Sequence, residues 1–185
     1  MSGSRARSGR PPATRSPWLT YALVAFAAVL FGALVLPRLG RSLESKPAPD
    51  FALPVLSGGE PGARVRLSEQ RGKLVLLDFW ASWCGPCRMQ TKVLQTVTQS
   101  AANKDVVVIG INVSDNPDAA QRYLDAVKPP WVVVGDAEGV ANEAYRVEAL
   151  PTLVAIDRAG KIFAVRRHFV SERELSALLA ALSAN

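Results

Sequence analysis

Cysteine and histidine are scarce in this chain of 185 residues, which contains two cysteines and one histidine. Two cysteines are too few for a disulfide-rich scaffold, and they supply only half of the ligands of a four-coordinate structural zinc site. With 13 residues each, glycine and proline are too few for a fibrous chain, and a hydrophobic fraction of 49% excludes a wholly disordered one. The length is that of one ordinary domain with an appendage.

Acidic residues are absent from positions 1–41, which hold six arginines. The whole chain has 22 basic and 16 acidic side chains, a net charge of +6. Since the six arginines account for this excess, the rest of the chain carries no net charge. Nucleic-acid-binding domains usually have a basic patch on their folded part. We therefore expect no nucleic-acid partner, and the charge asymmetry points to a membrane.

Charged residues are also absent from positions 18–36, which read WLTYALVAFAAVLFGALVL. As a helix that rises about 1.5 Å per residue, this segment would be roughly 28 Å long, close to the thickness of a hydrocarbon core. Trp18 and Tyr21 lie near one end, where amphipathic rings favour the headgroup level. The arginines before the segment favour a cytoplasmic N-terminus, which would place the rest of the chain outside the cytoplasm.

Two other interpretations of this segment remain open. A cleavable signal peptide also begins with a basic and an apolar region, although its apolar region is usually only about 7–15 residues long. A buried core helix would be expected to have a polar face, which this segment lacks. We predict a cytoplasmic basic tail (1–17), a transmembrane anchor (18–36), a tether (37–47) and a folded domain (48–185).

The remainder of the chain alternates short apolar runs with amphipathic stretches. Buried strands are expected at 73–80, 105–113 and 131–134, helices at about 87–102, 117–127 and 140–145, and a hairpin at 152–157 and 161–167. Ser171 and Glu174 form a capping box that begins a last helix. This order predicts an α/β domain in which helices cover both faces of a mixed central sheet.

The two cysteines stand together as Cys84-Gly85-Pro86-Cys87, where an expected strand passes into an expected helix. Backbone N–H groups and the helix dipole at this position stabilise a thiolate, which is the nucleophilic form of cysteine. Gly85 and Pro86 allow a tight turn into the helix. The alternatives are a structural disulfide, which would constrain little chain entropy over so short a loop, and half of a zinc site. The pattern favours redox chemistry.

Asp78 interrupts the apolar run before the cysteines. A buried carboxyl group without a partner is costly in its charged form, so its pKa would be raised. The alternative is an aspartate that faces water at the edge of a sheet. Pro151 also has two interpretations. It is either a cis proline or an ordinary trans proline at the start of a strand.

Residues 79–87 (FWASWCGPC) resemble the active-site segment of thioredoxin-like proteins, and Leu150-Pro151-Thr152 resembles their cis-proline loop. Residues 48–51 (APDF) and 67–73 are similar to the membrane-anchored extracytoplasmic branch, the TlpA/ResA-like thiol-disulfide oxidoreductases. The resemblance implies a thioredoxin fold from about residue 48 to the C-terminus. It also implies that residues 116–136 form a helix–strand unit that ordinary thioredoxin lacks.

The resemblance implies a role for each site residue. Cys84 would be the attacking thiolate, Cys87 the resolving thiol, and Asp78 the buried acid that relays the proton of the resolving cysteine. Trp83 would shield the disulfide, and Leu150 with a cis Pro151 would expose a sheet edge to an extended substrate. The resemblance implies no metal, and no cofactor beyond the redox-active disulfide.

The function implied is a membrane-tethered reductase of protein disulfides in the bacterial periplasm. Its electrons would come from a CcdA- or DsbD-like membrane thiol transporter. The candidate substrates include proteins of cytochrome c maturation and of copper-site maturation. Gly85 and Thr152 stand where some cytochrome c maturation members carry acidic residues. A disulfide-introducing oxidase would use the same two cysteines, and a Cu(I)-handling module is a third alternative.

Overall fold

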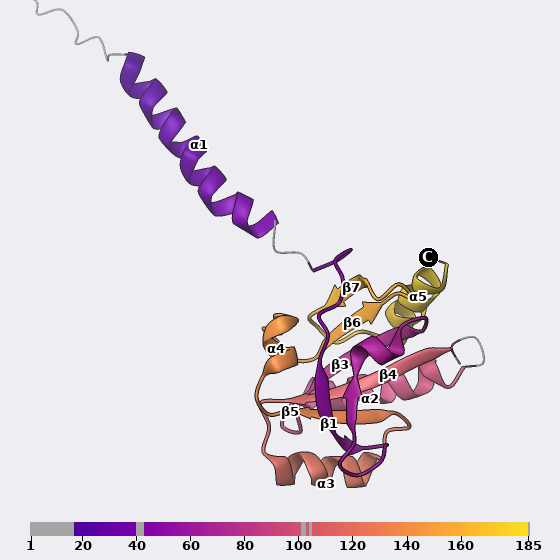
Figure 1. Cartoon of the computed structure of the whole chain (residues 1–185). Helices are drawn as coiled ribbons and strands as arrows, with labels where there is room; N and C mark the ends of the chain where they lie inside the picture. Colours follow the sequence, from indigo (N-terminus) through magenta and orange to yellow (C-terminus); the bar gives the residue numbers. More distant parts are fainter. Residues whose placement is uncertain (1–16, 40–42, 101–102, 104, 185) are drawn as a thin grey trace, which may run out of the picture. The chain divides into compact units, whose positions relative to one another are not determined.

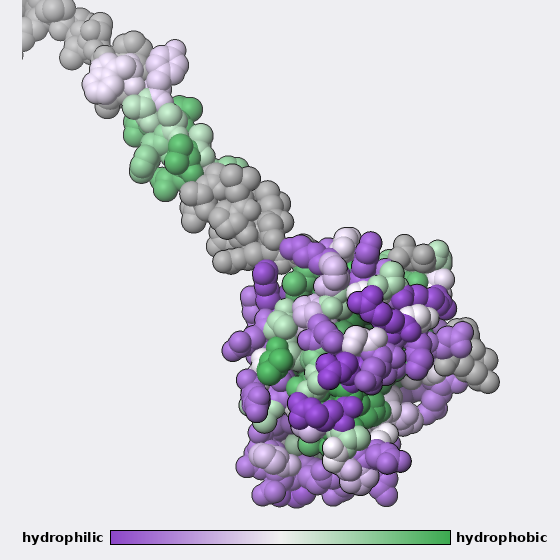
Figure 2. Space-filling model, in the orientation of Figure 1, coloured by the Kyte–Doolittle hydropathy of each residue, from purple (hydrophilic) through white to green (hydrophobic). Residues whose placement is uncertain are grey.

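The computed structural model describes residues 17–39, 43–100, 103 and 105–184, which fall into two compact units. The unit Met1–Ser42 contains helix α1 (Pro17–Leu39). Leu23, Phe26 and Phe31 of this helix are exposed. Figure 2 shows hydrophobic residues along the described part of the helix. In the part of the chain that the structure describes, no helix has both the length and the apolar character needed to cross a membrane. The predicted anchor at 18–36 stays a prediction. The predicted tail at 1–17 lies outside the described residues except for Pro17, and it also stays a prediction.

The unit Leu43–Asn185 is built on one mixed sheet of seven strands, in the order β2-β1-β5-β4-β3-β6-β7 (Figure 1). The strands are β1 (Ala52–Ser57), β2 (Arg64–Arg66), β3 (Leu74–Trp80), β4 (Val106–Val113), β5 (Val132–Asp136), β6 (Thr152–Ile156) and β7 (Ile162–Arg166). β3, β4 and β5 run parallel to one another, whereas the other neighbouring pairs are antiparallel. The central strand β3 lies between β4 and β6, and its residues are all buried.

Helices cover both faces of this sheet, as predicted. They are the short 3-10 helix Leu67–Gln70 and the α-helices α2 (Gly85–Thr98), α3 (Pro117–Val127), α4 (Val140–Ala144) and α5 (Glu172–Ser183). Leu77 and Phe79 face a core that includes Ala141 of α4. The alternate residue Leu76 packs with Leu94 of α2 and with α5. The period of two in β3 therefore sends neighbouring side chains into separate cores.

The two strands beyond β5, β1 and β2, are the part of the sheet that was not predicted from the sequence. β1 contains Pro54, and a proline inside a short run argues against a strand because it cannot donate to the ladder. β2 has only three residues. Both strands are defined by pairing, since β1 is antiparallel to β2 and to the distant β5. The expected elements are otherwise present, although α2 ends at Thr98 instead of near residue 102.

The folded unit begins earlier than residue 48, because part of the expected tether is bonded along β7. Ser45 N donates to Ile162 O at 2.7 Å, Ile162 N donates to Lys46 O at 2.9 Å, and Ala48 N donates to Gly160 O at 2.9 Å. Leu43 is buried in the same core as Phe79. From Leu43 onward the chain therefore covers an edge of the sheet that would otherwise be open.

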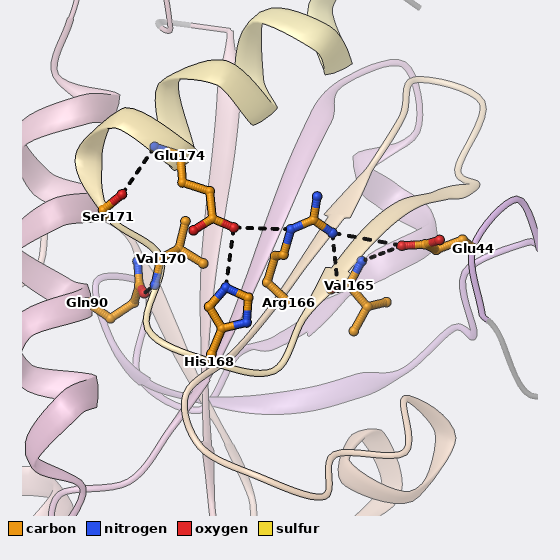
Figure 3. A network of polar contacts seen from close by, with 8 residues as sticks. All are labelled: Glu44, Gln90, Val165, Arg166, His168, Val170, Ser171 and Glu174. Atoms are coloured by element: carbon orange, nitrogen blue, oxygen red, sulfur yellow. Dashed lines mark hydrogen bonds and ion pairs between the residues drawn. The ribbon is translucent and has the colours of Figure 1, made fainter.

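A chain of charged side chains links this segment to β7 and α5 (Figure 3). Arg166 lies 3.9 Å from Glu44 and 3.3 Å from Glu174, whose carboxylate also lies 3.3 Å from His168. The Glu174 N–H donates to the Ser171 hydroxyl, so this half of the predicted capping box of α5 is present. The Glu174 side chain pairs with Arg166 of β7. Each of these partly exposed pairs contributes at most about 1 kcal/mol.

Tyr145 ties the start of the folded unit to its core. Its ring is fully buried against Phe79, with centroids 5.6 Å apart, and its hydroxyl donates to the Pro49 carbonyl at 2.7 Å. We expect Tyr145→Phe to lower the free energy of unfolding by about 1–2 kcal/mol, because the Pro49 carbonyl loses its donor. Tyr145→Ala should cost about 3–5 kcal/mol through the cavity that it leaves. Urea denaturation followed by circular dichroism measures both changes in the free energy of unfolding. Equal denaturation midpoints for wild type and Tyr145→Phe would contradict a stabilising role of the hydrogen bond to the Pro49 carbonyl.

Candidate active site

The two cysteines lie where β3 passes into α2, and they form a disulfide. The sulfurs are 2.00 Å apart and the Cα atoms 5.3 Å apart. Cys84 is the N-cap residue of α2, and its sulfur accepts a hydrogen bond from the Cys87 N–H at 3.2 Å. Pro86 lies in the first turn of the helix, where its missing N–H costs no helical bond. A helix N-terminus is thus directed at the sulfur of Cys84, which favours negative charge there.

The disulfide is enclosed by apolar side chains on most sides. Cys84 is 4% exposed and Cys87 is 1% exposed. They share a core with Trp80 at the end of β3 and with Ala120 and Leu124 of α3. A Cβ at Gly85 would meet no atom within 4 Å, so the surface over this position is open. The open surface at Gly85 thus lies directly beside the buried disulfide in the chain.

The structure brings Leu150 and Pro151 to the cysteines. The Leu150–Pro151 peptide bond is cis, as the resemblance implies, and the trans alternative is wrong. Thr152 is the register partner of Phe79 in the β3–β6 pair, which places the proline beside the end of β3. Leu150 packs against the apolar cluster that contains the two cysteines. The cis-proline loop and the cysteine loop thus form one site.

Asp78 is 2% exposed and lies in the middle of the central strand, so the alternative of a water-facing aspartate at a sheet edge is wrong. Its register partners are Gly110 of β4 and Leu153 of β6. Among the described residues its Oδ1 has no hydrogen-bond partner, and burial raises its pKa to about 7. Because side chains alternate along a strand, Asp78 faces the side covered by α2, the helix that carries Cys87.

Tyr123 of α3 covers this side of the site and was not singled out from the sequence. Its ring centroid is 4.9 Å from that of Trp80, and the Arg88 guanidinium lies 5.6 Å from it. Its hydroxyl donates to Thr91 Oγ1 of α2 at 3.1 Å. Burial raises the pKa of Tyr123, and the charge of Asp78 adds to this increase. The helix–strand unit at residues 116–136 therefore contributes directly to the site.

Asp115 is the second functional candidate that sequence reasoning missed. It lies in the loop between β4 and α3, and its carboxylate accepts hydrogen bonds from Ser82, Asn112 and Asn116. Burial alone would raise the pKa of Asp115, but these hydrogen bonds outweigh burial and hold the pKa below its usual value. The neighbouring Ser114 carbonyl accepts the indole N–H of Trp83 at 3.0 Å.

Every residue predicted for the site lies in or beside this one region, at the carboxyl ends of β3 and β4 and the start of β6. Trp83 is 65% exposed, with its indole nitrogen anchored to Ser114, and its shielding of the disulfide stays a prediction. A signal for Asp115 was available. Parallel neighbouring strands end at the same edge of a sheet, so the loop after 105–113 had to meet the loop after 73–80.

Comparison with known proteins agrees with this geometry. The family model Redoxin matches residues 43–182. Thiol:disulfide interchange protein DsbE of Xylella fastidiosa is 37% identical over 120 residues, which cover 64% of this chain and 58% of that protein. Thiol-disulfide oxidoreductase ResA of Bacillus subtilis is 30% identical over 122 residues, 66% of each chain. The chain thus spans about three fifths of the length of the DsbE relative.

Solved structures give the same result for the fold. A Chlorobium tepidum protein assigned as a thiol:disulfide interchange protein DsbE superposes with a TM-score of 0.68 at 33% identity, covering 76% of this chain and 99% of that one. A secreted disulfide oxidoreductase of Mycobacterium tuberculosis, homologous to E. coli DsbE, superposes with a TM-score of 0.62 at 30% identity and covers 71% and 96%. The chain has the thioredoxin fold and belongs to the Redoxin family, among its thioredoxin-like TlpA/ResA-like members.

Proposed function

We propose that the protein is a thiol-disulfide oxidoreductase that reduces disulfides in other proteins. The observation that carries this proposal is the disulfide between Cys84 and Cys87 at the N-terminus of α2, beside the cis Pro151. A structural role is less consistent with the position, because a bond that closes so short a loop restrains little of the unfolded chain. The disulfide is itself the redox group, so the proposed reaction needs no bound cofactor.

The proposed reaction begins with the reduced protein. The Cys84 thiolate attacks one sulfur of the substrate disulfide, which forms a mixed disulfide and releases the other substrate sulfur as a thiolate. Cys87 then loses its proton and attacks the Cys84 sulfur. The second substrate thiolate leaves, and the Cys84–Cys87 bond forms. Two electrons pass to the substrate, and the two released thiolates take up two protons.

Asp78 is the proposed acceptor of the Cys87 proton. Its pKa of about 7 means that near neutral pH it is ionised in part of the molecules and can take up a proton. Its burial under α2 keeps bulk water from replacing it in this role. The absence of a partner at Oδ1 among the described residues leaves that oxygen available.

The proposed substrate contact is an extended segment of a protein that lies across the open surface at Gly85. The exposed Trp83 indole precedes the cysteines in the chain, and the cis Leu150–Pro151 loop packs against the cluster that contains them. A proline there has no N–H of its own to satisfy, and an extended chain added beside it would gain main-chain hydrogen bonds. The site therefore suits peptide-like disulfides.

We further propose that the protein works outside the cytoplasm of a bacterium, held by the apolar segment 18–36 in the cytoplasmic membrane. This rests on the uncharged sequence of that segment and on the arginines before it. An extracytoplasmic reductant needs electrons from the cytoplasm, for which a CcdA- or DsbD-like membrane thiol transporter is the proposed donor. The proposed substrates are proteins of cytochrome c or copper-site maturation, which the sequence resemblance implies, and a relative named thiol:disulfide interchange protein DsbE supports exchange with disulfides.

Cysteine variants test the proposed reaction. We expect Cys84→Ser to abolish the acceleration that the protein gives to the reduction of insulin by dithiothreitol, because the attacking sulfur is lost. Cys87→Ser should instead accumulate a mixed disulfide with the substrate, visible by mass spectrometry and removed by reductant. If Cys84→Ser retained the activity of the wild type, the proposed function would be wrong.

The direction of the reaction is tested by equilibration with glutathione. A reductase should have a reduction potential near that of thioredoxin, about −270 mV. The Gly85-Pro86 dipeptide between the two cysteines is also that of thioredoxin. A potential near that of DsbA, about −120 mV, would show that the protein is an oxidase.

Asp78→Asn tests the proton transfer and the buried charge together. Because the folded-state pKa of about 7 lies above the usual 3.8, wild-type stability should fall as the pH rises from about 4 to beyond 7. The substitution should remove much of this pH-dependent loss of stability, which is on the order of 4 kcal/mol in the wild type. At pH 8 it should also slow release of substrate from the mixed disulfide, on the order of 100-fold. A variant with wild-type rates in stopped-flow measurements would rule out the proposed role of Asp78.

A further inference from the structure

The Asp115 carboxylate has its full complement of hydrogen-bond donors. Oδ1 accepts from Ser82 Oγ at 2.7 Å and from Asn116 N at 2.8 Å. Oδ2 accepts from Ser82 N and, at 2.8 Å, from Asn112 Nδ2. An ionised carboxylate has about four acceptor positions, so all are used. Asparagine could not replace it, because its NH₂ group would face donors.

Two of the four donors belong to Ser82, which lies two residues before Cys84. The same stretch is held at two further points. Trp83 Nε1 donates to the Ser114 carbonyl at 3.0 Å, and Arg88 of α2 donates to the Ser82 carbonyl at 2.9 Å. The residues that lead into Cys84 are therefore bonded on one side to the β4–α3 loop and on the other side to α2.

We infer that Asp115 is a positioning residue for the redox pair. When the disulfide is reduced, the covalent link that holds Cys84 against Cys87 is lost. The bonds from Asp115 to Ser82 then keep the backbone before Cys84 in the geometry of the closed pair. Re-forming the disulfide consequently costs less conformational entropy, and the equilibrium is shifted toward the disulfide. A dithiol that is more easily oxidised is a stronger reductant. This inference rests on the proposed exchange at Cys84 and Cys87.

The charge of Asp115 is a separate effect that the experiment must isolate. A negative charge near Cys84 disfavours a thiolate, so removing it would also change the redox equilibrium. Ser82→Ala removes one donor to Asp115 without changing any charge. Asp118→Asn removes a charge from the exposed first turn of α3, three residues away, without affecting Ser82. The two variants thus separate position from charge.

The experiment measures the equilibrium of the full-length protein with glutathione. The reaction is protein dithiol plus oxidised glutathione giving protein disulfide plus two reduced glutathione molecules, which carry away the two thiol protons. We expect the equilibrium constant to fall about tenfold in Asp115→Asn, which corresponds to the backbone entropy of about one residue that becomes free in the dithiol form. In Ser82→Ala, where part of the restraint remains, it should fall about threefold, and in Asp118→Asn it should stay within about twofold of the wild type. If Asp115→Asn does not fold, the equilibrium constant of Ser82→Ala alone tests the inference, and a wild-type value in that variant would overturn it.

Two results would overturn the inference, and a third would overturn the proposed function beneath it. Wild-type equilibrium constants in Asp115→Asn and Ser82→Ala, with lower stability of both redox forms against urea, would make Asp115 a purely structural residue. Equal shifts in Asp115→Asn and Asp118→Asn, with none in Ser82→Ala, would assign the effect to charge. A wild-type protein that does not exchange with glutathione at all would instead overturn the proposed function on which the inference rests.

Discussion

The parallel pairing of β3 with β4 is the interaction on which the site depends. Because both strands end at the same edge of the sheet, the loop with the two cysteines meets the loop with Asp115. The pairing also places Asp78 opposite Gly110 in the middle of the sheet, where water does not reach it. The antiparallel partner β6 then brings the cis-proline loop to the same edge.

Asp78 and Asp115 show how surroundings give one residue type two opposite properties. Asp78 is buried and its Oδ1 has no partner in the described chain, so burial raises its pKa to about 7. Asp115 is also partly buried, but four hydrogen bonds outweigh this and lower its pKa. The first group can exchange a proton near neutral pH, whereas the second stays charged and holds a loop. A carboxyl group with a raised pKa and one with a lowered pKa thus lie on adjacent parallel strands and the loops that follow them.

The sequence analysis was most successful where local chemistry decides the structure. The helix at 117–127 has the predicted bounds, because Pro117 occupies its first turn and the Asn116 side chain caps it. The prediction failed at β1 and β2, because β1 becomes a strand through pairing with β5 far along the chain and β2 becomes one through pairing with β1. For the same reason the segment from Leu43 to Pro47, expected as a tether, is bonded to β7.

The sequence alone predicted the reaction class that we propose, since two cysteines separated by two residues at a strand-to-helix junction favour redox chemistry. It also determined the fold class, through the order of apolar runs and amphipathic stretches. Only the tertiary structure decided that Asp78 is buried, that Tyr123 of α3 covers the site and that Asp115 holds Ser82. Burial and long-range hydrogen bonds depend on which segments meet in space, and local sequence does not contain that information.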